Sequence, residues 1–226
     1  MNHETAITYN QHSRKDRLLL ALFLLLYALI FAVRLPKLVF TGQWVLLSQA
    51  VVYGILGIGS IFLFRHELRA GLRGWKSSAL KNILWVIAAF VANTFITNIA
   101  VYPAYIGGFA DLLDNAGVAL MVQAIGRLPA ILVIGLAAPI VEECVYRAFL
   151  IGKLKTKIPL WVCVALSSVL FALAHMQRIS TGDFLCALPG LTTGLVYGFV
   201  YAKTGNITLP IIMHIANNMT GIVLGS

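Results

Sequence analysis

Five ionisable side chains lie inside otherwise apolar stretches of this sequence, where a charge is costly and usually marks a function or a buried ion pair. They are Glu142, Glu143, Arg147, His175 and His214. A carboxylate can act as a general base, and an imidazole can transfer protons, bind a metal or stabilise an oxyanion. These residue types point to hydrolysis, to proton or ion handling, or to a structural ion pair within a membrane.

Both acids and the arginine belong to one segment, which reads EECVYR over residues 142–147. On a helix, side chains at positions i and i+4 meet, so Glu143 and Arg147 are expected to pair. Glu142 lies about 100° away around the helix axis and has no counter-ion on its own helix. An unpaired carboxylate in a dry site suits a general base. The alternative is that both acids share Arg147 and only hold the helices together.

Each of the two histidines has a residue of interest four positions away on the same predicted helix. Phe171 and His175 share a helix face, and so do His214 and Asn218. Together with Glu142, the two imidazoles can hold a water molecule and remove its proton, and the same three side chains are a possible set of zinc ligands. A single intramembrane histidine, by contrast, more often only joins two helices through a hydrogen bond.

The composition indicates the scaffold that must position these groups. The 226 residues are 60% apolar and 11% charged, with a mean hydropathy of +0.88, which excludes a soluble globular protein, a disordered chain and a nucleic-acid-binding module. Backbone groups cannot stay unpaired in lipid, so each apolar run is expected to be a helix. The runs lie at residues 18–33, 44–64, 83–102, 129–151, 158–175, 184–202 and 207–224. We predict an all-α, polytopic transmembrane helix bundle that forms a single membrane domain over residues 1–226.

The predicted number of spans is seven or eight. Residues 104–126 are less apolar, carry Asp111, Asp114 and Asn115, and form either an interfacial helix or part of an eighth span. With seven spans, twelve Lys and Arg residues fall in the loops on the N-terminal side and four in the opposite loops. The positive-inside rule then places the N-terminus in the cytoplasm, in a multi-pass protein of the cell membrane.

Two further patterns predict how the helices pack. If the helix that carries Glu142 stopped near residue 150, Glu142 and His175 would lie at different depths and could not meet. We therefore predict that this helix continues to about Lys155. Glycine recurs every four positions at Gly190, Gly194 and Gly198. On a helix these residues form one stripe without side chains, which lets a neighbouring backbone pack closely.

Taken in order, three motifs resemble those of the CPBP intramembrane proteases, which include the Rce1-type CAAX prenyl proteases and bacterial Abi proteins linked to bacteriocin immunity. The motifs are Glu-Glu-x-x-x-Arg (142–147), Phe-x-x-x-His (171–175) and His-x-x-x-Asn (214–218). The resemblance covers about residues 125–226, which would form the protease core. Cys144 and Tyr146 stand where an aliphatic residue and Phe are expected.

The resemblance implies a role for each matching residue. Glu142 would activate a water molecule with the help of His175, and His214 and Asn218 would stabilise the oxyanion that forms on the scissile carbonyl. The supporting ion pair would be Glu143 with Arg147.

The resemblance leaves the cofactor open. The family is described as metalloproteases, yet a metal-free glutamate mechanism fits the same residues. Two alternatives stay open: a zinc ion bound by Glu142, His175 and His214, or a site without a metal. The substrate would be a peptide or a membrane protein, cleaved within the cytoplasmic half of the bilayer, with a role in peptide processing or bacteriocin self-immunity.

Two alternatives from other functional classes stay open at the level of sequence. The first is a proton- or ion-coupled transporter that uses the same polar groups, although no internal repeat of the kind common in transporters is visible. The second is a non-catalytic immunity or regulatory membrane protein. Neither a His-Glu-x-x-His nor a Gly-x-Ser-Gly motif occurs, which disfavours the common zinc-helix and rhomboid-like protease types.

Overall fold

The computed structural model describes residues 14–113, 116–176 and 178–224. Every regular element in these ranges is a helix and no strand occurs in them, so the all-α prediction is confirmed. The first half of the bundle contains α1 (Arg14–Tyr27), η3 (Ala28–Ala32), α2 (Leu35–Val39), α3 (Gln43–Leu63), α4 (Arg65–Ala100), α5 (Tyr102–Ile106) and η4 (Ala110–Leu113). The second half contains α6 (Ala116–Ile125), α7 (Arg127–Ala130), η5 (Ile131–Ala137), α8 (Ala138–Glu143), η6 (Cys144–Ile151), α9 (Gly152–Leu154), α10 (Leu160–His175), α11 (Thr181–Cys186), α12 (Leu188–Thr204) and α13 (Thr208–Leu224).

Four helical stretches among the described residues are long and apolar enough to cross a membrane. They are Gln43–Leu63, Arg65–Ile106, Arg127–Leu154 and Thr181–Thr204. The other three predicted runs also lie in helices, namely α1 with η3, α10 and α13. Because α10 and α13 have 16 and 17 residues, they are shorter than the roughly 20 residues that a typical crossing needs. The protein is a multi-pass helical bundle, and the total of seven or eight spans stays a prediction.

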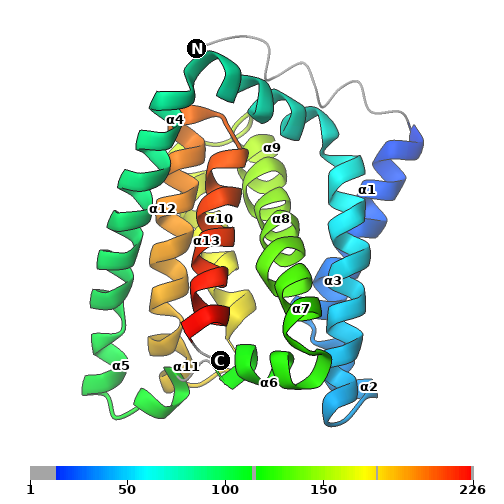
Figure 1. Ribbon diagram of the computed structural model, residues 1–226, viewed down its shortest axis with the longest axis vertical. Coiled ribbons are helices and arrows are strands. Elements are labelled where there is room, and N and C mark those ends of the chain that lie inside the picture. The colour runs from blue at the N-terminus through cyan, green and yellow to red at the C-terminus, as the bar shows by residue number, and fades with distance from the viewer. Residues whose placement is uncertain (1–13, 114–115, 177, 225–226) are drawn as a thin grey trace.

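Successive long helices run up and down along the vertical axis of the bundle (Figure 1). The start of α4 and α9 lie at one end, whereas α2, α5, α6 and α11 lie at the other (Figure 1). The less apolar stretch at residues 104–126 contributes to α5, η4 and α6, and it stays at the α2 end. Asp111 lies in η4, and Asp114 and Asn115 lie outside the described residues.

The side chains are distributed as lipid requires. Large apolar side chains such as Ile58, Phe95 and Val162 are more than half exposed on the outer faces, at 62%, 68% and 51%. Glu143 and Arg147, in contrast, are completely buried. An exposed apolar surface around a buried charged centre is the arrangement of a bundle solvated by a bilayer.

The glycine stripe of α12 packs closely against a neighbouring helix, as predicted, and the structure identifies that helix as α10. A Cβ atom on Gly194 would lie 2.9 Å from the Cα of Ser168, and one on Gly198 would lie 3.0 Å from a methyl carbon of Val164. Since real Cβ atoms almost never approach a backbone atom this closely, a larger residue at position 194 would push the helices apart. This close contact fixes the distance between the helix that ends in His175 and the helix that supports Arg147.

One continuous helix carries both acids. It runs from Arg127 to Leu154 and contains two π-helical segments, η5 and η6, on either side of α8. Its end at Leu154 confirms the prediction that it extends to about Lys155. Pro139 lies in the first turn of α8, where a missing backbone N–H is best tolerated next to a widened helical turn. Such π-helical turns occur frequently at functional sites.

Candidate active site

Arg147 is paired with Glu143 rather than with Glu142. Its Nη1 donates to Glu143 Oε1 at 3.1 Å, which confirms the predicted i, i+4 pair, and its Nη2 donates to the carbonyl oxygen of Gly194 at 3.2 Å. The guanidinium carbon also lies 4.9 Å from the ring centre of Phe171, within cation–π range. These contacts hold Arg147 on the side of the helix away from Glu142, so Glu142 is not neutralised by it.

Glu143 has a second partner that the sequence did not indicate. His214 Nδ1 lies 2.9 Å from the same oxygen, Glu143 Oε1, and the imidazole is almost fully buried. Since a carboxylate accepts, the hydrogen sits on Nδ1, and Nε2 is left to point the other way. His214 Nε2 lies 3.8 Å from Glu142 Oε2. The Glu143–Arg147 pair therefore orients the imidazole toward Glu142.

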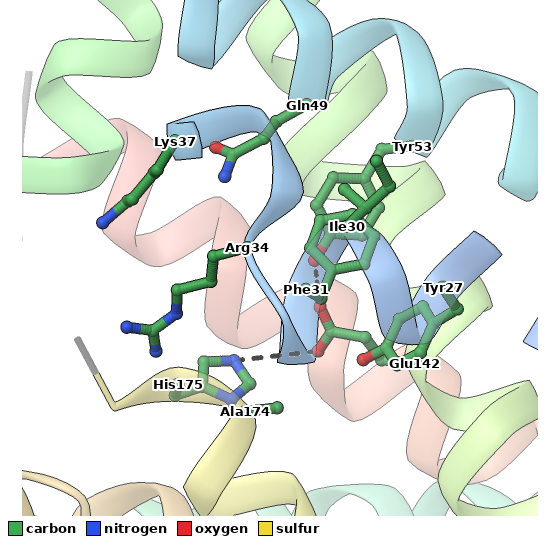
Figure 2. A pocket seen from close by; sticks show the side chains of 10 residues that line it. All are labelled: Tyr27, Ile30, Phe31, Arg34, Lys37, Gln49, Tyr53, Glu142, Ala174 and His175. Carbon is green, nitrogen blue, oxygen red and sulfur yellow. Dashed lines mark hydrogen bonds and ion pairs between the residues drawn. The ribbon is translucent and has the colours of Figure 1, made fainter. Parts of the chain in front are cut away.

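His175 is oriented in the same manner by its own helix. Its Nδ1 lies 2.8 Å from the carbonyl oxygen of Phe171, which can only accept, so Nδ1 carries the hydrogen. Its Nε2 faces Glu142 Oε2 at 3.9 Å (Figure 2). The spacing Phe-x-x-x-His thus has a structural reason, because the residue four positions earlier fixes the imidazole tautomer.

Glu142 lies where α3, α8, α10 and α13 meet. Its Oε1 accepts a hydrogen bond from the hydroxyl of Tyr53 at 2.8 Å, whereas its buried Oε2 has no hydrogen-bond partner among the described residues. Two imidazole Nε2 atoms face this oxygen at distances too long for direct hydrogen bonds. A water molecule placed between these three atoms could donate a hydrogen to Glu142 Oε2 and form hydrogen bonds with the imidazoles.

A pocket of about 170 Å³ leads to this oxygen. Glu142 and His175 line it together with Tyr27, Phe31 and Tyr53 (Figure 2). A cavity needs only about 10–15 Å³ of such space to hold one water molecule, so this pocket has room for more than the water alone. The site is therefore a lined pocket with a carboxylate at its base.

The position of the pocket bears on the expectation of a site in the cytoplasmic half of the bilayer. Arg34 and Lys37, beside and within α2, line it, so it opens at the end opposite α9 and the basic loops (Figure 1). Whether the site lies in the cytoplasmic half depends on the orientation of the bundle in the membrane, so that expectation stays a prediction. Because the helix continues to Leu154, Glu142 lies about 18 Å from its basic end at about 1.5 Å per residue.

Asn218 is set apart from the other three predicted catalytic residues. Its amide Nδ2 donates to the carbonyl oxygen of Ile134 in η5 at 2.9 Å, and no contact with Glu142 is seen for it among the described residues, whereas His214, which like Asn218 does not line the pocket, faces Glu142 directly. The structure thus brings Glu142, His175 and His214 together, with Asn218 one turn further along α13. Its predicted part in oxyanion stabilisation stays a prediction.

The zinc expectation gains no support from the arrangement of ligands. Within the described part of the chain, no three His, Cys, Asp or Glu side chains are placed so that they could hold a metal ion. The hydrogen bond from Tyr53 also occupies one oxygen of Glu142. We derive no step that passes through a metal.

Sequence reasoning missed the aromatic residues around Glu142. Tyr53 in α3 binds Glu142 directly, and Tyr27 in α1 lies 3.2 Å, hydroxyl to hydroxyl, from Tyr146 in η6. Both tyrosines stand alone in apolar runs, and a hydroxyl within lipid needs a partner. That need was the available signal, although it does not reveal which partner the hydroxyl finds.

The fold and the site together define a polytopic, all-helical membrane protein with a buried glutamate–histidine centre. Residues 124–220 match the family described as "Type II CAAX prenyl endopeptidase Rce1-like". This match falls on the part of the chain that carries the three motifs, and it agrees with the resemblance to the CPBP family seen in them.

Two curated relatives extend this result. The protein named "Putative membrane peptidase YdiL" of Bacillus subtilis is 29% identical over 186 residues, which cover 81% of this chain and 71% of the relative. The UPF0177 protein YxdF of Lactococcus lactis subsp. lactis is 28% identical over 160 residues, which cover 68% of this chain and 81% of the relative. No solved structure gives a significant match. The family and the first relative support a peptidase that acts in a membrane.

Proposed function

We propose that this protein is an intramembrane endopeptidase of the Rce1 type that hydrolyses a peptide bond with a water molecule activated by Glu142. One observation carries the proposal. The Oε2 of Glu142, which has no hydrogen-bond partner among the described residues, faces the Nε2 atoms of His175 and His214 at 3.9 and 3.8 Å, and Glu142 and His175 line a pocket. A structural ion pair has no need for this convergence of acceptors.

The proposed reaction begins with proton transfer to Glu142. As Glu142 removes a proton from the water, the water oxygen attacks the scissile carbonyl carbon, with His175 holding the water in line. The carbonyl oxygen becomes an oxyanion, which His214 in its protonated form and the amide of Asn218 would stabilise. When the C–N bond breaks, Glu142 returns the proton to the amine nitrogen.

The supporting pair has a distinct part in this scheme. Glu143, held by Arg147, accepts from His214 Nδ1 and so orients the imidazole with its Nε2 toward Glu142, where the oxyanion would form. The cation–π contacts of Arg147 keep this pair in place. No step requires a metal, so we expect a chelator to leave the reaction unchanged.

We also propose seven spans, with α1–η3, α10 and α13 added to the four candidates. The stretch from α5 to α6 stays at one end of the bundle, which argues against an eighth crossing (Figure 1). The positive-inside rule then places the N-terminus and the α9 end in the cytoplasm. Peptide processing or bacteriocin self-immunity is the proposed cellular role.

The decisive experiment compares membrane peptidomes of cells that produce the native protein and the Glu142→Gln variant. The amide is isosteric and still accepts from Tyr53, so the variant should fold. We expect new peptide termini only with the native protein, and a loss of cleavage by about 10²–10⁴-fold in the variant. Equal cleavage by both proteins would contradict the assignment of the base. Ion flux through proteoliposomes without any cleavage would favour the transporter alternative.

A further inference from the structure

A group of cations stands at the mouth of the pocket, and the hydrolytic scheme does not use it. Arg34 and Lys37 line the same pocket as Glu142 and His175. The α2 end of the bundle carries four bases in all, at Arg34, Lys37, Arg127 and Arg178. Two of them therefore lie where a substrate must pass.

A third base at this end lies close to the first two. The pKa of Lys37 is lowered, first by partial burial and then by the positive charges of Arg34 and Arg178. Like charges that are held near one another repel, and an anion that binds among them lowers this repulsion. We refer to Arg34, Lys37 and Arg178 as the cation cluster.

The backbone also holds Arg34 in an uncommon conformation. With φ of 59° and ψ of 37°, Arg34 is the non-glycine residue with a positive φ among the described residues. L-residues adopt this left-handed region at an energetic cost, and strained residues tend to occur at functional sites. Figure 2 shows the charged ends of Arg34 and Lys37 on the side of the pocket where His175 lies.

We propose that Arg34 and Lys37, supported by Arg178, form an anion subsite that holds a carboxylate of the peptide substrate while the scissile carbonyl lies at Glu142. The inference rests on the proposed function, because it assigns a specificity to the same pocket. The planar guanidinium of Arg34 can bind both oxygens of a carboxylate, and the Lys37 ammonium adds a compact point charge. The carboxylate can come from a free C-terminus or from an acidic side chain next to the scissile bond.

The test measures binding rather than cleavage, so it does not depend on turnover. The Glu142→Gln protein, in nanodiscs of zwitterionic lipid, is titrated with three dansyl hexapeptides that share the sequence Ala-Leu-Ala-Leu-Val-Ala. One ends in a free carboxylate, one in an amide, and the third is an amide with Asp as its fifth residue. Fluorescence anisotropy reports each affinity. We expect at least one anionic peptide to bind about tenfold more tightly than the neutral amide, which corresponds to ~1.4 kcal/mol.

A second protein removes the charges and keeps the backbone. Asn tolerates the left-handed conformation, so the changes Arg34→Asn and Lys37→Gln are made together in the same background. In this double variant, the ratio of the affinities for the anionic and the neutral peptide should fall to about one. The matched control is an Arg127→Gln protein, because Arg127 is an exposed base that does not line the pocket; its ratio should stay unchanged. An unchanged preference in the double variant, or no preference in the parent protein, overturns the proposal.

Three outcomes distinguish this proposal from the proposed function and from lipid binding. If native protein cleaves the acid and amide peptides equally well, the hydrolase stands and the anion subsite fails. If the anionic peptide binds selectively but the native protein cleaves nothing, the subsite stands and the hydrolase fails. If the double variant binds the peptides as the parent does but retains less phosphatidylglycerol when purified from membranes, the cation cluster binds lipid headgroups, and the substrate assignment is wrong.

Discussion

Glu142 and Glu143 are neighbours in the sequence but face different surroundings. Glu143 accepts from both Arg147 and His214, whereas Glu142 accepts from Tyr53 and turns its second oxygen toward two imidazoles. The difference follows from the rotation of about 100° per helical residue, which sends adjacent side chains into separate contacts. The first acid therefore stays available for chemistry, and the second acid is part of the support.

Tyr53 gives a prediction outside the region matched by the family. In a Tyr53→Phe variant the ring keeps its place, but Glu142 loses the hydrogen bond of 2.8 Å that fixes its orientation. A hydrogen bond to a charged group contributes about 1.5–3 kcal/mol, so we expect the cleavage rate to fall by at least tenfold. The measurement is the turnover rate, with the thermal midpoint as control. An unchanged rate would show that Glu142 needs no help from α3.

Arg147 gives the opposite kind of prediction. In an Arg147→Ala variant, Glu143 keeps a buried charge without its counter-ion, and breaking a buried pair costs about 3–5 kcal/mol. We expect a reduced yield of folded protein, measured by size-exclusion chromatography in mild detergent. The matched control is Arg127→Ala, since Arg127 is exposed. A folded, inactive Arg147→Ala protein would instead indicate a direct role in the reaction.

At the scale of elements, spacing within one helix could be predicted and contacts between helices could not. The pairing of Glu143 with Arg147 and the alignment of the α12 glycines on one helix face follow from four-residue periodicity, which the sequence contains, whereas the choice of α10 as the partner of that face does not. The contacts of Tyr53 with Glu142 and of Asn218 with Ile134 join residues 89 and 84 positions apart, so they depend on tertiary packing. The π-helical turns around α8 also have no simple sequence signal.

The contact between α10 and α12 predicts a graded effect of glycine substitution. A Cβ on Gly194 would meet the Ser168 backbone at 2.9 Å, while one on Gly190 would meet Ala172 at 3.6 Å, which is ordinary contact. Gly194→Ala also displaces the carbonyl that accepts from Arg147. We expect Gly194→Ala to lower stability by about 1–3 kcal/mol and Gly190→Ala to leave it nearly unchanged. Thermal unfolding of both variants in detergent tests this, and equal midpoints would contradict it.

At the scale of the whole molecule, the charge pattern and the pocket point to opposite ends. Lys153 lies in α9, and Lys155 and Lys157 follow it, whereas Arg34, which precedes α2, and Lys37, within α2, line the pocket. Figure 1 shows α9 and α2 at opposite ends of the bundle. The sequence could predict the first fact, because basic loops are visible in it. It could not predict the second, because the opening depends on how α1, α2 and α10 pack around Glu142.

The two facts together predict the side from which a substrate enters. If the basic end is cytoplasmic, the pocket receives peptides from the outer side of the membrane. Lys37 and Lys155 are both exposed and lie at opposite ends of the bundle, so each is changed to Cys in a separate protein. Both proteins also carry Cys186→Ala, because the other two cysteines, Cys144 and Cys163, are buried. We expect a membrane-impermeant maleimide to label the protein with Lys37→Cys in intact cells. The protein with Lys155→Cys should react only after permeabilisation, and the reverse pattern would place the pocket on the cytoplasmic side.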